Sequence, residues 1–196
     1  MASTARARGS SRERILLTAH DLFYRDGVRA TGVDRLIAEA GVTKVTFYRQ
    51  FPSKDDLIRA YLAFRHDMWM SWFRDALERN CALQSRAERR AAPLAPVLAA
   101  AREWFLRPEF RGCAFINSVA ELAGVLPDVS VIAANHKGEA ARAIETLLSE
   151  GPPSARKARA ALAALDGAIV AAQAGEAHVE AALQTLDFTL RALDGV

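Results

Sequence analysis

The chain has 196 residues, enough for one domain of ordinary size or for a small domain followed by a larger one. Hydrophobic residues make up 51% of it, yet no run of about 18 apolar residues occurs, so neither a membrane-spanning helix nor a membrane partner is expected. The basic N-terminal stretch has no apolar segment behind it, and the two cysteines, Cys81 and Cys113, give no disulfide framework, so we expect no secretory signal and a cytoplasmic location.

The net charge of +3 is unevenly distributed along the chain. Residues 1–60 hold 11 Lys and Arg against 7 Asp and Glu, whereas the remainder holds 15 against 16. The positive excess therefore lies in the N-terminal part, as a phosphate-facing domain requires. Arg6 and Arg8 lie in a small, polar N-terminal stretch, which is either an arm that reaches DNA or a solvated tail.

The first predicted helix runs from Ser11 to about Arg25. Ser11 can cap it, and Asp26-Gly27 ends it. Its apolar residues recur at helical spacing along one face and are expected to be core: Ile15, Leu16, Ala19, Leu22 and Phe23.

Two short helices joined by a tight turn are predicted between Thr31 and Leu57. Gly41 stops the first of them, because glycine adopts a left-handed backbone at low cost. Thr43 is the expected N-cap of the second, which spans Lys44–Gln50 and is polar on one side. This pattern predicts a helix-turn-helix, whose second helix enters the major groove of DNA.

The same stretch resembles the DNA-binding domain of the tetracycline-repressor (TetR) family of bacterial regulators. The matching residues are Thr31, Val33, Leu36, Ala40-Gly41-Val42, Thr43, Thr46-Phe47-Tyr48, Phe51 and Ser53-Lys54-Asp55. The resemblance implies an all-α fold of about nine helices. It further implies an N-terminal helix-turn-helix domain over residues 1–53, a C-terminal ligand-binding and dimerisation domain over residues 54–196, and a double-stranded DNA operator as partner.

Side-chain chemistry and the resemblance together predict the residues that contact DNA. Lys44 offers donors to guanine or to a phosphate, and Val45 can contact a thymine methyl group. By resemblance, Lys54 binds a phosphate from the start of the fourth helix. The complete predicted set is Thr43, Lys44, Val45, Thr46, Tyr48, Arg49, Gln50 and Lys54. Val45 and Gly32 depart from residues common in the family, so the operator cannot be borrowed from a relative.

The rest of the chain predicts a helical body. We expect helices from about Lys54 to Arg79, Pro93 to Leu106, Phe110 to Ala123 and Pro127 to Glu150. Residues 80–92 are expected to form a polar surface connection, with or without part of a helix. By resemblance, this body holds a small-molecule effector. The candidate ligand contacts, each of which could equally be a core residue, are Trp69, Trp72, Phe73, Trp104, Cys113, Asn117, Glu121 and His136.

Cys113 has two interpretations. A free cysteine is usually a small buried apolar residue, but near a helix N-terminus its thiolate would be favoured and could sense oxidants or electrophiles.

The last two predicted helices, from Ser154 to about Ala174 and from Glu176 to about Leu193, are rich in small residues. By resemblance, they form a four-helix dimer interface with a second copy; alternatively, their apolar side covers the core of one chain. The predicted anchors are Leu162, Leu165, Ile169, Leu183, Leu186 and Leu190.

No nucleophile motif, phosphate-binding loop or metal-ligand spacing occurs, so we expect no enzyme, metal or cofactor. The sequence predicts a homodimeric, ligand-responsive transcriptional regulator, most simply a repressor. The alternatives are a redox or electrophile sensor acting through Cys113, a constitutive DNA-binding protein, and a helical enzyme or binding protein that has lost DNA binding.

Overall fold

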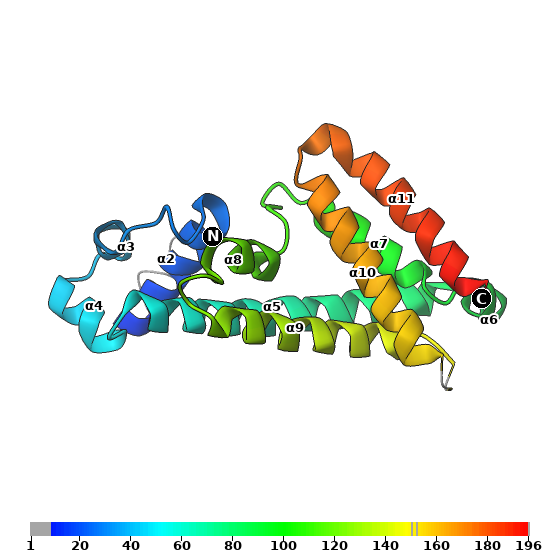
Figure 1. Ribbon diagram of the computed structural model, residues 1–196, viewed down its shortest axis with the longest axis horizontal. Coiled ribbons are helices and arrows are strands. Elements are labelled where there is room, and N and C mark those ends of the chain that lie inside the picture. Colours follow the sequence, from blue (N-terminus) through cyan, green and yellow to red (C-terminus); the bar gives the residue numbers. More distant parts are fainter. Residues whose placement is uncertain (1–8, 150, 152, 196) are drawn as a thin grey trace. The chain divides into compact units, whose positions relative to one another are not determined.

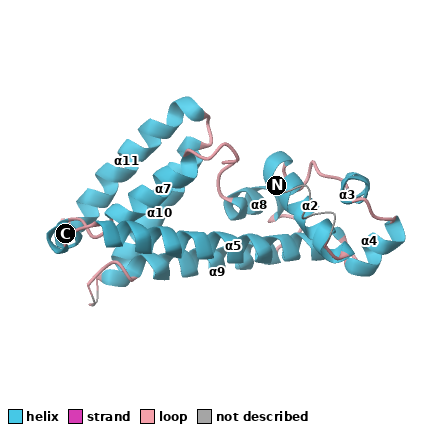
Figure 2. Cartoon of the chain, turned by 180° about the vertical axis from the view of Figure 1, so that it is seen from behind, coloured by secondary structure: helices cyan, strands magenta, loops and turns pink. Residues whose placement is uncertain are grey.

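The computed structural model describes residues 9–149, 151 and 153–195, and within them every regular element is a helix (Figures 1 and 2). The ten helices of this part of the chain confirm the predicted all-α class. They are α2 (Ser11–Asp26), α3 (Val33–Ala40), α4 (Lys44–Gln50), α5 (Lys54–Leu83), α6 (Arg86–Ala91), α7 (Ala95–Phe105), α8 (Ala114–Leu122), α9 (Asp128–Glu145), α10 (Ser154–Ala172) and α11 (Glu176–Asp194). None of these helices combines the length and the apolar character needed to cross a membrane. The predicted N-terminal arm with Arg6 and Arg8 lies outside the described residues.

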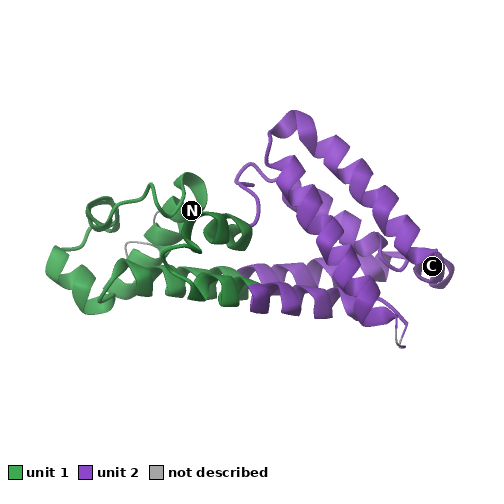
Figure 3. Cartoon of the chain, viewed as in Figure 1, with its two compact units in different colours: residues 1–67, 114–133 green, residues 68–113, 134–196 purple. Residues whose placement is uncertain are grey.

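The helices form two compact units (Figure 3). The first unit comprises residues 1–67 and 114–133, and the second comprises residues 68–113 and 134–196. This division differs from the predicted boundary after residue 53, because α5 and α9 each begin in the first unit and end in the second. Helix α8 also belongs to the first unit, together with α2, α3 and α4.

The core of the first unit lies between α2, α3, α4 and the beginning of α5. Leu22, Leu36, Phe47 and Leu57 contribute one side chain from each helix, and each is at most 1% exposed. This burial is what the helical spacing of the apolar residues predicts. Helix α2 begins as expected at Ser11, but its N-cap is the preceding residue, Ser10, whose hydroxyl accepts a hydrogen bond from the Glu13 amide.

The core of the second unit includes the packed helices α7, α10 and α11. Small residues on α10, such as Ala158, Ala161 and Ala168, are buried and leave little side-chain bulk between neighbouring helices. The six predicted dimer anchors lie in this core and are each at most 7% exposed within a single chain: Leu162, Leu165, Ile169, Leu183, Leu186 and Leu190. These side chains therefore pack chiefly within their own chain, and their contact with a second copy stays a prediction.

Several helix boundaries in the body differ from the predicted ones. Helix α5 continues to Leu83, and the segment predicted as a surface connection contains the short helix α6, which Ser85 and Glu88 begin with a reciprocal capping box. Helix α8 begins at Ala114 rather than near Phe110, because Gly112 has a positive φ of 82° that a helix cannot accommodate. Helix α9 ends at Glu145, five residues earlier than predicted.

Candidate nucleic-acid interface

Local hydrogen bonds fix the turn between α3 and α4. Gly41 takes up the left-handed conformation with φ 62°, and its amide and that of Val42 bond to the last carbonyls of α3. Thr43 then caps α4, since its hydroxyl oxygen accepts from the Thr46 amide at 3.1 Å and its proton is donated to the Thr46 hydroxyl at 2.9 Å. The predicted turn, cap and bounds of α4 are confirmed.

Helix α4 has one buried side and one exposed side. Phe47 is fully buried, and Phe51, the residue after the helix, is 1% exposed. On the opposite side, Val45 is 78% exposed and Tyr48 is 41% exposed, and Lys44 and Arg49 are also exposed. A short helix that presents an apolar, an aromatic and two cationic side chains to solvent has the chemistry of a major-groove reader.

Two arginines of α2, which the sequence analysis counted only as charge, hold the helix-turn-helix together. Arg12 donates to the Gln50 carbonyl at 2.7 Å, and its guanidinium lies 4.2 Å from the centre of the Phe51 ring. Arg14 donates to the Gly41 carbonyl at 3.2 Å. Both arginines satisfy carbonyls that lack partners at helix C-termini, so α2 fixes the ends of α3 and α4. Arg12 and Arg14 lie three and one residues before the first core residue, Ile15, and these positions gave no sequence signal for this role.

Lys54, the predicted phosphate contact, is engaged inside the chain in this structure. Its ammonium donates to the Val28 carbonyl at 2.7 Å and lies 5.8 Å from the centre of the Phe23 ring. Burial lowers the pKa of Lys54, while attraction to Glu121 acts in the opposite direction. The chain therefore uses this cation to bind its own α2–α3 connection.

A second charged group supports the end of α2. The Asp26 carboxylate pairs with Arg25 at 2.9 Å and with Arg35 of α3 at 2.8 Å. The pKa of Asp26 is lowered to about 2, mainly by the hydrogen bond from Arg25. The hydrogen bond from Arg35 is the next largest contribution that lowers it. Arg35 also reaches Glu39 one turn along α3.

Helix α8 contains two of the predicted ligand contacts, and the structure gives one of them another role. Glu121 accepts a hydrogen bond from the Arg29 amide at 2.8 Å, so its carboxylate is bound to the loop before α3. This hydrogen bond gives Glu121 a structural role, and its predicted contact with a ligand stays a prediction. Asn117 lies one turn earlier on the same helix and is half-buried.

In the second unit, five predicted ligand contacts form an aromatic cluster. Trp69 lies at its centre, stacked on Phe73 with ring centroids 4.5 Å apart and edge-on to Trp104 at 5.5 Å and His136 at 5.0 Å. Trp72 lies 6.2 Å from Trp69, and the Arg107 guanidinium covers its other side at 4.4 Å. The indole N–H of Trp69 is buried and finds no hydrogen-bond acceptor among the described residues.

Cys113 is buried next to a charged pair. Its Sγ lies 3.5 Å from the Lys137 ammonium, which also donates to the Asp166 carboxylate. Cys113 is the residue directly before α8.

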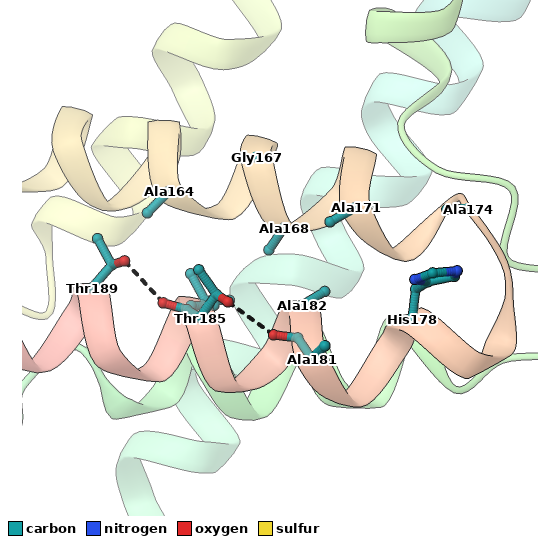
Figure 4. Close-up of a pocket in the computed structure, with 11 residues that line it drawn as sticks. Ala164, Gly167, Ala168, Ala171, Ala174, His178, Ala181, Ala182, Thr185 and Thr189 are labelled. Atoms are coloured by element: carbon teal, nitrogen blue, oxygen red, sulfur yellow. Dashed lines mark hydrogen bonds between the residues drawn. The ribbon is translucent and has the colours of Figure 1, made fainter.

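A groove with a volume of about 530 Å³ runs between the outer sides of α10 and α11 (Figure 4). Small residues such as Ala164, Gly167 and Ala181 make up most of its walls, together with Leu186 and His178. Thr185 and Thr189 also line it, but their hydroxyls donate to carbonyls one turn earlier in α11, so the surface that they add is largely methyl. The same two helices expose Val170 (54%) and Phe188 (76%).

The exposed second helix of a two-helix motif, packed on a third helix and held by capped turns, defines a helix-turn-helix protein. The family model of bacterial regulatory proteins, tetR family, matches residues 15–61. The chain belongs to this family of DNA-binding transcriptional regulators.

Relatives agree with this assignment to different extents. The uncharacterised HTH-type transcriptional regulator YxaF of Bacillus subtilis is 44% identical over 52 residues, which are 26% of this chain and 27% of the length of YxaF. The crystal structure of SCO4454, a TetR-family regulator from Streptomyces coelicolor, matches 94% of this chain and 96% of its own with a TM-score of 0.74 and 29% identity. A cysteine mutant of the TetR-family regulator CifR, in complex with 26-base-pair operator DNA, covers 91% of this chain and 94% of its own with a TM-score of 0.70; at 23% identity it shows the fold alone.

Proposed function

We propose that the protein is a homodimeric repressor that binds a palindromic operator in the cytoplasm through α4 and is released from it by a small molecule. The observation that carries this proposal is the two-sided character of α4. Phe47 fixes the helix to the core, while Lys44, Val45 and Tyr48 extend into solvent where a major groove would lie. CifR, which has the same fold, is complexed with operator DNA.

The proposed DNA contacts follow from exposure and chemistry. Lys44 and Arg49 supply cationic donors, Val45 supplies apolar contact with a thymine methyl group, and Tyr48 supplies a hydroxyl for a phosphate. Thr43, Thr46 and Gln50 lie at the two ends of the same helix, where their polar groups can reach the backbone or base edges. Lys54 is left out of this set because its ammonium bonds to the Val28 carbonyl.

The homodimer follows from the geometry of the operator and from the apolar groove on α10 and α11. Two recognition helices have to lie about 34–36 Å apart to enter successive major grooves, so two chains are required. We propose that the second copy covers the groove through the equivalent surface around Gly167 and Ala181, with Phe188 beside it. An exposed phenylalanine next to small side chains is a self-complementary apolar surface of the kind that twofold interfaces use.

The effector is proposed to act at the aromatic cluster of the second unit. The buried N–H of Trp69 lacks an acceptor among the described residues, and a bound molecule can supply one. The dimer can adopt a conformation in which the two recognition helices are not spaced for successive major grooves. A ligand that binds this conformation more tightly increases its population and so releases DNA. A coupling free energy of only about 1–3 kcal/mol between ligand binding and DNA binding is needed.

A fluorescence anisotropy titration with DNA from the region upstream of the protein's own coding sequence tests the proposal. We expect the anisotropy to rise as a salt-sensitive complex with two chains per operator forms. The double substitution Lys44→Ala and Tyr48→Ala should abolish this complex. No complex with any neighbouring promoter, at low salt as well, would contradict the regulator function. All three tryptophans of the chain, Trp69, Trp72 and Trp104, lie in the cluster, so their fluorescence reports directly whether a compound that releases DNA acts there.

A second candidate, sensing of electrophiles through Cys113, is favoured by the Lys137 ammonium 3.5 Å from its sulfur. A nearby cation stabilises the thiolate that attacks an electrophile. In alkylation by N-ethylmaleimide the sulfur–carbon bond forms and the thiol proton ends on the neighbouring carbon of the reagent. If Cys113 is the sensor, the reagent abolishes DNA binding by the wild type and by Cys81→Ser but not by Cys113→Ser; equal loss in Cys113→Ser excludes it.

A further inference from the structure

A single peptide group in the connection between α2 and α3 is bound at both ends by charged side chains. Its N–H, from Arg29, donates to the Glu121 carboxylate at 2.8 Å. Its carbonyl, from Val28, accepts from the Lys54 ammonium at 2.7 Å. The negative group therefore faces the positive end of the peptide dipole, and the positive group faces the negative end. We call Glu121, Lys54 and this peptide the peptide clamp.

The loop is shaped to receive the carboxylate. Gly27 has φ +89°, and a Cβ atom on it would lie 3.3 Å from both carboxylate oxygens of Glu121. The backbone conformation favours glycine at this position, and a Cβ atom would also press on the Glu121 carboxylate. The buried Thr31 closes the other side of the loop by donating to the Gly27 carbonyl at 2.8 Å.

The peptide clamp joins elements that are distant in sequence but belong to the same compact unit. Glu121 is 92 residues from Arg29, and Lys54 is 26 residues from Val28. Glu121 lies in the last turn of α8 and Lys54 in the first turn of α5, while the loop between them leads directly into α3. Because α3 carries the turn that begins α4, the position of this loop sets the direction of the recognition helix.

We propose that Glu121 is a positioning residue for DNA binding, which acts through the peptide clamp, and that Lys54 is a structural cation of the clamp and not a phosphate contact. The proposal rests on the proposed DNA binding through α4. It assigns to α8 a direct connection to the helix-turn-helix through a hydrogen bond that a movement of α8 would break.

Partial burial of the clamp makes each charge difficult to remove alone. Burial lowers the pKa of Lys54, and the Glu121 carboxylate partly compensates by stabilising the charged amine. Removing either partner leaves the other beside a polar group that it was oriented to bind. The two charged groups therefore support each other while both are bound to the same peptide group.

The test measures operator affinity and its salt dependence for Glu121→Ala, Glu121→Gln and Lys54→Met, using the full-length protein and the upstream DNA defined above. We expect at least tenfold weaker binding for E121A, because the Arg29 amide loses its acceptor. E121Q should recover most of the affinity, since its side-chain oxygen still accepts from that amide. The control variant Glu109→Ala, at an exposed glutamate, should bind as the wild type does.

The salt dependence separates a clamp residue from a phosphate contact. Each phosphate contact contributes about 0.9 to the slope of log K against log salt. K54M should bind more weakly with an unchanged slope. K44A removes one contact from each of the two chains on the operator and should lower the magnitude of the slope by about 1.8. Wild-type affinity in E121A, or a slope reduced by about 1.8 in K54M, would overturn the proposal.

Amide exchange at Arg29 keeps the test independent of DNA. Exchange at this amide should be slow in the wild type and E109A, intermediate in E121Q and fast in E121A, while the helix amides of α3 exchange at similar rates in all four. Fast exchange in the wild type would refute the clamp even if the protein binds no DNA. Absence of DNA binding by a wild type with a protected Arg29 would refute the proposed function and, with it, the role of Glu121 in DNA binding.

Discussion

The substitution Gly167→Leu tests the proposed dimer without disturbing the single chain. Gly167 lies in α10 and lines the groove between α10 and α11, and a Cβ atom on it meets nothing within 4 Å. Within one chain the new side chain therefore enters open space. Replacing glycine inside a helix also gains about 0.5–1 kcal/mol of helix propensity, so the monomer should be at least as stable as the wild type.

The same side chain is costly if a second copy covers the groove. An extra side chain in a well-packed interface costs about 1–3 kcal/mol, and twofold symmetry introduces it twice. The dimer should therefore be weakened by about 2–6 kcal/mol, which corresponds to roughly 30-fold to 20,000-fold in the dissociation constant. DNA binding should weaken with it, because a palindromic operator engages two chains together.

Sedimentation velocity over a range of concentrations measures this change directly. The matched control is Gly138→Leu in α9, where the new Cβ approaches only the flexible end of Arg142 at 3.6 Å. We expect G138L to remain dimeric and G167L to become monomeric at micromolar concentration, with equal or higher melting temperature. A G167L dimer as tight as that of the wild type would refute the assignment of this groove to the interface, and a monomeric wild type would refute the homodimer.

Three further predictions concern the helix-turn-helix. Thr43→Ala removes the N-cap of α4 and should destabilise the fold by about 1 kcal/mol, a fall of roughly 2–4 °C in melting temperature. The control Thr43→Ser should retain the cap. Equal melting temperatures of the two variants would contradict the hydrogen bond between the Thr43 hydroxyl and the Thr46 amide. Tyr48→Phe keeps the ring but removes the hydroxyl, and we expect weaker operator binding in an anisotropy titration with unchanged thermal stability, since Tyr48 is 41% exposed. The pKa of Asp26 is lowered from 3.8 to about 2, mainly by Arg25, so its ionised form stabilises the folded state above pH 3.8 and this contribution is lost as the pH falls through about 2. Urea unfolding of Asp26→Asn should accordingly show a shallower loss of stability between pH 4 and pH 2 than the wild type shows, and parallel curves would exclude a role for this carboxylate.

The role of Lys54 shows where resemblance and structure part. The motif around Ser53-Lys54-Asp55 matches the family, and the resemblance alone implies a phosphate contact. In the structure, the ammonium is within hydrogen-bond distance of the Val28 carbonyl, because the α2–α3 connection passes the first turn of α5. A family motif predicts which residue type occurs at a position. Which group that side chain binds depends on the segment that the fold places beside it, here the α2–α3 connection.

The two faces of α10 and α11 give a second example. The sequence shows that Leu165, Ile169, Leu183 and Leu186 recur at helical spacing, but this spacing cannot tell whether such a face meets its own chain or a second one. The structure shows that all four side chains are at most 1% exposed within a single chain, so they pack chiefly against their own chain. The surface that we propose for a second copy is the groove between α10 and α11. Its lining is mostly alanine, glycine and threonine, and these residues do not form a strongly hydrophobic pattern in the sequence.

Local chemistry alone determined the helix-turn-helix. The left-handed Gly41, the Thr43 cap and the bounds of α4 depend on residues at most four positions apart, and such interactions can be read directly from the sequence. Tertiary structure decided everything that depends on distant partners. The bond between Glu121 and the Arg29 amide joins residues 92 positions apart, and no spacing along the chain encodes it. Only the packing of α8 beside the α2–α3 connection brings the carboxylate to that amide.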